Sequence, residues 1–259
     1  MLSLKQIESF YPEYLRPFKK NLLREYLQYK ILEFIFDSRY GENLAFMGGT
    51  ALRVIHSNDR FSEDLDFDNW GLTQDKFELL TDVISKKLRY EGYTVEVNNV
   101  FKGAYRSYVK ITNILYEYGI SNHKNEKLLI QVDTEPQRIK YNPEKVIINK
   151  FDVFIRVNTV PSDMLLSQKI ACIFTRKRPM GRDFYDVVFL TGRTGPDWTY
   201  LKLKLKISDE NDLKDKLLAK CEKYNFKQLS RDIEPFLITP GSSKKILYFT
   251  DFIKETKFK

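Results

Sequence analysis

Asp64 and Asp66 alternate with the apolar residues Leu65 and Phe67, a pattern typical of a half-buried β-strand. Side chains two residues apart on a strand point to the same face, so we expect the two carboxylates to lie side by side. Like charges at that separation repel each other unless a cation lies between them. Hard oxygen ligands suit Mg²⁺, which also takes phosphate oxygens and water as ligands. The pair is therefore a candidate magnesium site.

A glycine turn, Gly48-Gly49-Thr50, precedes the acidic pair. The apolar run of residues 44–47 predicts a short strand that leads into this turn, and residues 50–56 predict a helix after it. Backbone N–H groups at the start of a helix favour an anion, so we expect the turn to hold phosphate groups. The sequence does not match a P-loop, because no Gly-Lys-Thr follows a glycine-spaced loop. A phosphate cradle beside two metal-binding carboxylates predicts phosphoryl or nucleotidyl transfer.

The residues from Gly48 to Arg53, followed by Arg60-Phe61-Ser62-Glu63-Asp64-Leu65-Asp66-Phe67, resemble the signature of the AbiEii/AbiGii-type nucleotidyltransferases. That group belongs to the DNA polymerase β-like superfamily and includes abortive-infection and toxin–antitoxin toxins. The resemblance extends over residues 44–190. It implies an NTP substrate, Mg²⁺ with Mn²⁺ as the alternative, an RNA acceptor for which the tRNA 3′ end is favoured, and a cognate antitoxin. The nucleotide-binding residues that we expect are Gly48, Gly49, Thr50, Arg53, Arg60, Ser62 and Arg182.

Two of these arginines have structural alternatives. Arg53 lies in the expected short helix, where it either reaches the triphosphate or bridges to an acidic neighbour. Arg60 and Ser62 come just before the acidic strand and are expected to support phosphate or the local structure.

Asp133 is the expected third carboxylate. It lies near the end of a predicted strand, residues 127–134, where related nucleotidyltransferases place an acid beside the Asp-x-Asp strand. An acid at that place completes a magnesium site or accepts the proton of the attacking hydroxyl. Glu135 takes this role if the strand is shifted, and the alternative role for Asp133 is to start a turn.

Lys169 lies on a predicted helix, within a stretch from 164 to 182 that contains no acidic residue. By the family resemblance it contacts the triphosphate, and Arg182-Asp183 opens the next helix. Arginine and lysine both bind phosphate oxygens, arginine in a bidentate geometry. Asp183 is expected to orient Lys169 or a substrate hydroxyl, to cap its helix, or both. Asp186 is expected to pair with Arg182 one turn earlier.

The composition limits the classes of protein that fit. The 259 residues are 42% hydrophobic and 30% charged, which predicts a folded globular protein rather than a disordered one. No apolar run approaches the roughly 20 residues that span a bilayer. With two cysteines, Cys172 and Cys221, and no signal-peptide pattern, we expect a cytoplasmic protein without a disulfide framework. A net charge of +8 favours a polyanionic partner such as RNA.

The patterns predict an α+β fold, namely a nucleotidyltransferase-like mixed β-sheet with flanking helices followed by a mostly helical C-terminal half. We expect a catalytic domain at residues 1–160 and a helical domain at residues 161–259 that contributes Lys169, Arg182 and Asp183 to the site. The predicted elements include helices at 15–37, 73–90, 162–175, 183–191 and 246–256, strands at 93–101, 105–112 and 127–134, and a strand pair at 146–155.

Two other functions fit the same residues. One is nucleotidyl transfer to a small molecule or a protein, which needs a basic surface less than an RNA acceptor does. The other is a non-catalytic module that binds nucleotide or RNA. The intact Asp64–Asp66 pair and Lys169 argue against the second alternative.

Overall fold

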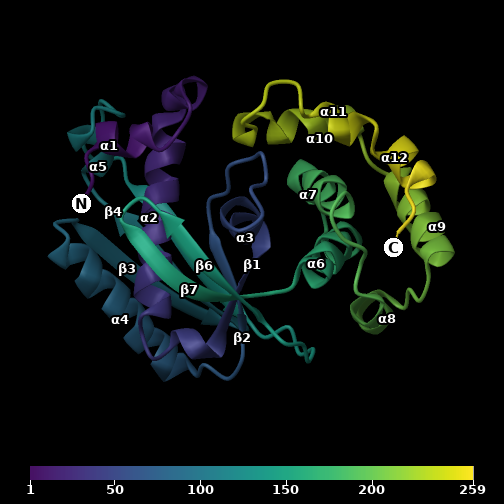
Figure 1. Ribbon diagram of the computed structural model, residues 1–259, viewed down its shortest axis with the longest axis horizontal. Coiled ribbons are helices and arrows are strands. Elements are labelled where there is room, and N and C mark those ends of the chain that lie inside the picture. Colours follow the sequence, from purple (N-terminus) through teal and green to yellow (C-terminus); the bar gives the residue numbers. More distant parts are fainter. Residues whose placement is uncertain (259) are drawn as a thin grey trace. The chain divides into compact units, whose positions relative to one another are not determined.

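The structure is a computed structural model that describes residues 1–258, and the chain forms two compact units. The first comprises Met1–Ser57 and Phe61–Thr159, and the second comprises Asn58–Arg60 together with the chain from Val160 onward. In Figure 1 the first unit runs from purple to teal, and the second, apart from residues 58–60, runs from green to yellow. The assignment of residues 58–60 to the second unit has no counterpart in the sequence pattern.

A seven-stranded mixed sheet forms the centre of the first unit, in the order β3-β4-β5-β2-β1-β7-β6. The β2–β5 and β1–β7 pairs are parallel, and the other neighbours are antiparallel. The strands are β1 (Leu44–Met47), β2 (Leu65–Asn69), β3 (Val95–Lys102), β4 (Ala104–Ile111), β5 (Leu128–Glu135), β6 (Glu144–Lys150) and β7 (Val153–Thr159).

Helices cover one face of this sheet. The helices of the first unit are α1 (Leu4–Ser9), α2 (Lys19–Phe36), α3 (Gly48–Val54), α4 (Gln74–Tyr90) and α5 (Ile114–Glu117), with 3-10 turns at Glu13–Phe18 and Gly41–Asn43. Phe36 at the end of α2 packs on Phe67 of β2, and Phe77 of α4 packs on Tyr105 of β4. Because side chains alternate along a strand, Asp66 points to the opposite face, away from this core.

The second unit is helical. Its helices are α6 (Ser162–Thr175), α7 (Gly181–Thr191), α8 (Trp198–Leu205), α9 (Glu210–Cys221), α10 (Phe226–Ile233), α11 (Lys244–Leu247) and α12 (Phe249–Glu255), with a 3-10 turn at Glu234–Phe236. Phe184 is fully buried at the centre of its aromatic core, with ring centroids 5.4 Å from Phe226 and 4.9 Å from Phe249. Gly181 lets α7 approach α10 closely, since a Cβ there would lie 2.1 Å from the carbonyl oxygen of Leu229.

The predicted α+β class with its mixed sheet is confirmed. The helix expected from Thr50 begins two residues earlier, at Gly48, and the helix expected at 246–256 is broken at Tyr248 into α11 and α12. The sequence did not predict α8. The strand pair expected at 146–155 is confirmed as β6 and β7, which are separated by a turn at Phe151 with a positive φ of 59°.

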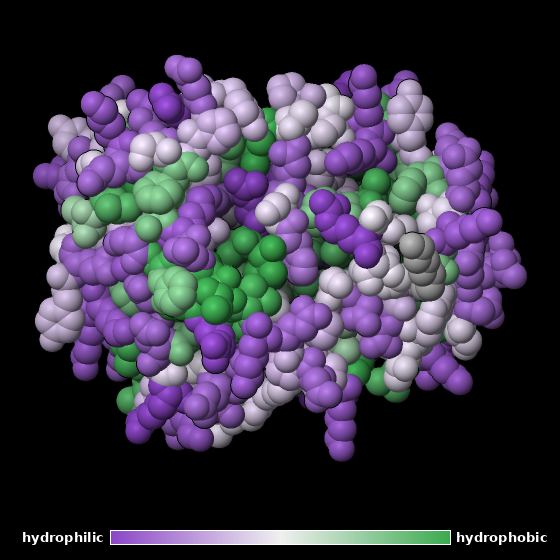
Figure 2. All heavy atoms as spheres, in the orientation of Figure 1, coloured by the Kyte–Doolittle hydropathy of each residue, from purple (hydrophilic) through white to green (hydrophobic). Residues whose placement is uncertain are grey.

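Hydrophilic side chains dominate the face drawn in Figure 2, and a green apolar patch interrupts them where Figure 1 draws the first unit. Ile147 and Phe154, on the neighbouring strands β6 and β7, are exposed by 53% and 69%. Within residues 1–258, no helix combines the length and the apolar character needed to cross a bilayer.

Candidate active site

Asp66 and Asp133 lie side by side on the face of the sheet opposite to α2 and α4. In the parallel register of β2 and β5, Asp66 is the partner of Asp133, and Asp68 is the partner of Glu135. Asp64 comes one residue before β2 and is half-buried, as is Asp66. The sequence pattern predicted that all three aspartates lie near one another, and the register brings the third beside the second.

Gly48 touches the Asp66 carboxylate directly. Its φ of +78° lies in the left-handed region that favours glycine. A Cβ at this position would lie 2.1 Å from Asp66 Oδ2 and 2.8 Å from Asp66 Cβ, well inside van der Waals contact. Backbone conformation and space therefore both require glycine here, and the turn is packed against the acidic strand.

Thr50 and Gln28 fix the segment that carries Asp64. The Thr50 side chain is fully buried, and its hydroxyl donates a hydrogen bond to the main-chain carbonyl of Asp64. From α2, Gln28 Nε2 donates to the carbonyl oxygens of Ser62 at 3.1 Å and Glu63 at 2.9 Å. Thr50 and Ser62 were both expected to bind nucleotide. The hydrogen bonds seen here are to the carbonyl of Asp64 from the Thr50 hydroxyl and to the carbonyl of Ser62 from Gln28, so both contacts position the backbone around Asp64.

Arg53 bridges to an acidic neighbour, the second of the two roles that the sequence left open. Its Nε lies 2.9 Å from Glu25 Oε2, and Lys150 Nζ lies 2.7 Å from Glu25 Oε1. Burial raises the pKa of Glu25, but the charges of Arg53 and Lys150 outweigh burial and leave that pKa below its ordinary value. This ionised cluster anchors α3, and with it the glycine turn, to α2.

Arg106 holds Asp133, a contact that the sequence pattern did not predict. Arg106 Nε lies 2.9 Å from Oδ1 and 3.1 Å from Oδ2 of Asp133, and Nη2 lies 3.0 Å from Oδ2. Gln131 Nε2 donates to the same Oδ2 at 2.8 Å. The hydrogen bonds from Arg106 to Asp133 raise the pKa of Arg106 above its ordinary value. Arg106 is the register partner of Asp133 on β4, and that pairing is not visible in the sequence.

The donor set fits a divalent cation at Asp64 and Asp66. Mg²⁺ is usually bound by one or two protein carboxylates, with substrate phosphates and water completing the octahedron. Within residues 1–258, no three His, Cys, Asp or Glu side chains gather closely enough to hold a metal ion. Asp64 and Asp66 supply two such carboxylates, and Asp133 is engaged by Arg106.

Asp68, the next acidic residue on this strand, has a structural role. It is 1% exposed and accepts hydrogen bonds from Trp70 Nε1 at 2.8 Å, the backbone N–H of Gln137 at 2.8 Å and the hydroxyl of Tyr141 at 2.6 Å. Asp68 thus anchors the segment that follows β5. Glu135, the register partner of Asp68 on β5, is exposed. It lies two residues after Asp133, which is the partner of Asp66.

In the second unit, Lys169 belongs to a buried ion cluster around Asp186. Arg60 binds Asp186 in a bidentate geometry, with Nε 2.7 Å from Oδ1 and Nη2 2.6 Å from Oδ2. Lys169 Nζ lies 2.9 Å from Oδ2, and Asn58 Nδ2 donates to Oδ1 at 2.9 Å. Burial by itself would raise the pKa of Asp186. The positive charges of Arg60 and Lys169 outweigh burial and lower this pKa below its ordinary value, to about 2.

This cluster changes the expected contacts of two residues. Asp186 pairs with Arg60 and Lys169, and not with Arg182 as its spacing suggested. Arg60 is 1% exposed, so in this conformation its guanidinium supports the structure rather than facing a nucleotide. Residues 58–60 thereby belong with the second unit.

Asp183 caps α7, one of the roles expected for it. Its Oδ2 accepts a hydrogen bond from the backbone N–H of Met180 at 3.0 Å and lies 3.1 Å from Arg176 Nη1. The side chain is fully buried, and Oδ1 has no hydrogen-bond partner among the described residues. Arg182, next to it, is half-exposed.

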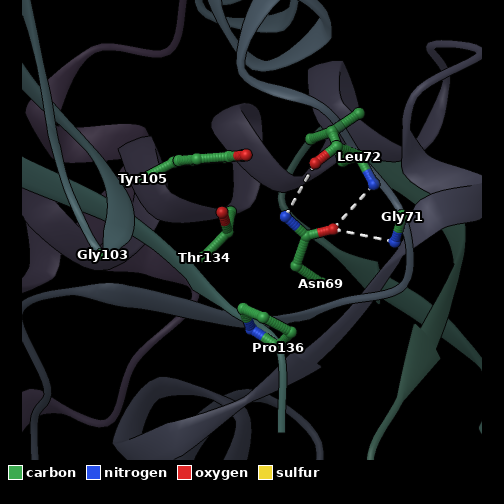
Figure 3. Close-up of a pocket in the computed structure, with 7 residues that line it drawn as sticks. All are labelled: Asn69, Gly71, Leu72, Gly103, Tyr105, Thr134 and Pro136. Atoms are coloured by element: carbon green, nitrogen blue, oxygen red, sulfur yellow. Dashed lines mark hydrogen bonds between the residues drawn. The ribbon is translucent and has the colours of Figure 1, made fainter. Parts of the chain in front are cut away.

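A cavity of about 200 Å³ lies on the other face of the same strands. Figure 3 shows the hydroxyls of Tyr105 and Thr134 on one side and Asn69 with Leu72 on the other. Asn69 is held by hydrogen bonds to the Leu72 backbone, whereas Thr134 is 1% exposed and its Oγ1 has no hydrogen-bond partner among residues 1–258. The cavity lining is Asn69, Gly71, Leu72, Gly103, Tyr105, Thr134 and Pro136.

Solved structures with the same fold come from Helicobacter pylori. The crystal structure of JHP933 superposes with a TM-score of 0.57 at 17% identity, covering 90% of this chain and 90% of that chain. A second H. pylori structure, of a proposed nucleotidyltransferase, superposes with a TM-score of 0.56 at 17% identity, covering 90% of this chain and 92% of that chain. At this identity the likeness shows the fold. A comparison with curated proteins found no significant match.

The protein-family model "Nucleotidyl transferase AbiEii toxin, Type IV TA system" matches residues 30–241. The match takes in the glycine turn, the acidic strands, and helices α6 and α7. This chain therefore belongs to the AbiEii family of nucleotidyltransferase toxins from type IV toxin–antitoxin systems, and it is a nucleotidyltransferase.

Proposed function

We propose that this nucleotidyltransferase transfers a nucleoside monophosphate from an NTP to a hydroxyl group of RNA, with the tRNA 3′ end as the favoured acceptor. The observation that carries the proposal is the meeting of Gly48, Asp66 and Asp133 at one place on the sheet. A backbone turn suited to phosphate and a row of carboxylates suited to a divalent cation are the two parts that nucleotidyl transfer requires. Growth arrest would follow from the modified acceptor.

In the proposed reaction, the acceptor hydroxyl oxygen attacks the α-phosphorus of the NTP in line. The bond from that phosphorus to the oxygen of the β-phosphate breaks, and pyrophosphate leaves. The hydroxyl proton passes to a carboxylate, for which Asp133 is the candidate because it lies beside Asp66. Positioning and charge stabilisation supply most of the rate acceleration.

Asp64 and Asp66 are the residues that would hold Mg²⁺, with Mn²⁺ as its substitute. Bound there, the ion would neutralise charge that develops on the phosphate oxygens. The backbone of Gly48 and Gly49 is proposed to receive the β- and γ-phosphates, since Gly48 abuts the Asp66 carboxylate. Thr50 contributes by fixing Asp64.

For the second unit, the assignment of Lys169 and Arg182 to the triphosphate stays a prediction from the family resemblance. Lys169 is 8% exposed and paired with Asp186, so its ammonium group is held in one place rather than left mobile. A fixed cation is suited to a phosphate group, because no further ordering is needed when the nucleotide binds.

The RNA acceptor is supported by the charge of the chain. The net charge of +8 remains although the site itself gathers carboxylates, so an excess of cationic side chains lies elsewhere on the surface. We also propose a cytoplasmic location, where NTPs and tRNA occur together, and control by a cognate antitoxin, which the toxin–antitoxin family suggests.

The test is incubation of the protein with total RNA, Mg²⁺ and each α-labelled NTP in turn. Label should enter RNA from at least one NTP, and pyrophosphate should be released in step. Parallel reactions without RNA, and with protein or small-molecule fractions as acceptors, separate the proposed acceptor from the alternatives. Label in a protein or small-molecule fraction, and none in RNA, would contradict the proposal.

A further inference from the structure

We propose that Arg106 takes the place of a second divalent cation beside Asp133, so that the site binds one metal ion, at Asp64 and Asp66. The inference rests on the proposed nucleotidyl transfer and specifies the metal content of that site. It makes Asp133 an oriented carboxylate held by a guanidinium group, and not a metal ligand.

The first argument is the occupancy of Asp133. An ionised carboxylate has about four lone-pair positions on its two oxygens. Arg106 Nε approaches Oδ1 at 2.9 Å, and Oδ2 accepts from Arg106 Nη2 at 3.0 Å and from Gln131 Nε2 at 2.8 Å. Both oxygens are therefore engaged by donors from the protein. Arg106 Nε also lies 3.1 Å from Oδ2, so a metal ion that bound both oxygens of Asp133 would have to displace a donor, whereas one position on Oδ1 stays open for the proton of the acceptor hydroxyl.

The second argument is that the clamp is built into the sheet. Arg106 and Asp133 are register partners on β4 and β5, so their side chains leave the same face at the same height. Tyr105 and Thr134, one residue away on each strand, are also partners and point to the opposite face. The arginine therefore reaches Asp133 from a fixed backbone position rather than from a loop.

The third argument is electrostatic. Arginine stays protonated in proteins, and its hydrogen bonds to Asp133 raise its pKa further. In two-metal sites the ions lie roughly 3.5–4 Å apart and share carboxylates. A second ion at Asp133 would lie next to a permanent positive charge, which disfavours its binding. The guanidinium already neutralises Asp133, so the reason for a second ion is removed.

The competing explanation is a gate, in which Arg106 swings away when nucleotide binds and leaves Asp133 for a second metal ion. The Arg106 side chain is 41% exposed, so movement toward solvent is sterically open. The two explanations differ in the number of ions bound when nucleotide is present.

The experiment counts Mn²⁺ ions bound per chain by electron paramagnetic resonance, in the presence of a non-hydrolysable NTP analogue. The wild-type chain should bind one ion. Asp133→Asn should also bind one, because Asp133 is not a ligand, and Arg106→Gln should bind two. The double variant Arg106→Gln/Asp133→Asn should return to one, since the second ion needs the released carboxylate.

Arg156→Gln is the matched control, because it removes an exposed arginine from β7 in the same unit and should leave the count at one. Two ions in the wild-type chain, loss of an ion in Asp133→Asn, or a count of one in Arg106→Gln would overturn the inference. Asp66→Asn tests the underlying site separately: unchanged Mn²⁺ binding in that variant would contradict the proposed metal site itself, whatever Arg106 does.

Discussion

At the residue scale, the contact between Gly48 and Asp66 sets the geometry of the acidic site. The carboxylate lies where a side chain at position 48 would otherwise stand. Gly92 offers a comparison, because its φ of +93° is similarly left-handed but a Cβ there would meet no atom within 4 Å. The two glycines separate the effect of backbone strain from the effect of lost space.

Gly48→Ala should therefore reduce nucleotidyl transfer by about 10²-fold, the order of loss that follows from misplacing a reacting group by about 1 Å. Gly92→Ala should cost some stability through its positive φ but leave the turnover of folded protein unchanged. Turnover per folded chain, with folding followed by circular dichroism, decides between them. Equal activities in the two variants would remove the special role of Gly48.

Asp186 is the buried centre of an ion cluster in the second unit, and its pKa makes its contribution to stability dependent on pH. The folded-state pKa is lowered from 3.8 to about 2, so the contribution is fully present above pH 3.8 and is lost as the pH falls toward 2. The shift corresponds to about 2 kcal/mol. Burial opposes ionisation, but the nearby Arg60 and Lys169 outweigh it.

Asp186→Asn should lower the free energy of unfolding by about 3–5 kcal/mol at neutral pH, because Arg60 is then left buried without its counter-charge. The difference between wild type and variant should shrink as the pH falls below 4. Urea unfolding at a series of pH values measures it. A difference that stays constant down to pH 3 would show that the ionised Asp186 does not stabilise the fold.

At the element scale, the β4-β5-β2 strands present two different faces around the same residues. One face carries Asp66, Asp133 and Arg106, and the other carries Thr134 beside the cavity in Figure 3. Thr134 Oγ1 is buried and has no hydrogen-bond partner among the described residues. A buried hydroxyl that lacks a partner costs roughly 1–3 kcal/mol relative to water.

Thr134→Val should consequently stabilise the protein by roughly 1 kcal/mol, since it keeps the β-branched shape and removes the hydroxyl. Thr159→Val is the matched control, because Thr159 is equally buried but its hydroxyl donates to the Phe46 carbonyl at 2.9 Å. That variant should be destabilised by about 1–2 kcal/mol. Thermal unfolding of both variants gives the comparison, and a loss of stability in Thr134→Val would show that its hydroxyl is satisfied.

The sequence predicted the parts of the site that depend on local pattern. A few consecutive residues are enough to predict the strand around Asp64 and Asp66, the glycine turn and the strand that bears Asp133. The Arg106–Asp133 clamp was not predicted, because it depends on which strands pair and in which register. The Arg60–Asp186 pair joins residues 126 positions apart, so nothing in the local pattern around Arg60 indicates it.

At the scale of the whole molecule, the charge of +8 makes RNA binding sensitive to salt. Lys177 and Arg178 lie in the exposed segment between α6 and α7, whereas the adjacent Arg176 is held by Asp183. Neutralising the first two therefore tests charge without disturbing the cap of α7.

Lys177→Gln/Arg178→Gln should weaken tRNA binding and flatten its log–log salt slope. The slope should change by up to about 0.9 for each phosphate group of a duplex that the protein ceases to neutralise, and by about 0.7 on a single strand. The control Lys5→Gln/Lys76→Gln makes the same change in net charge at exposed positions of the first unit. NTP affinity should change little in either. Identical salt slopes for the two double variants would assign the effect to net charge rather than to this segment.

The most direct test of the account is the transfer of α-labelled NMP to RNA by Asp66→Asn, the variant that removes one carboxylate from the centre of the proposed site. This variant should keep its fold, and its rate of transfer should be lower than that of the wild type by more than about 10²-fold. Asp75→Asn, an exposed aspartate in the first turn of α4, should retain it. If Asp66→Asn labels RNA at a rate near that of the wild type, the chemistry does not take place at this acidic strand.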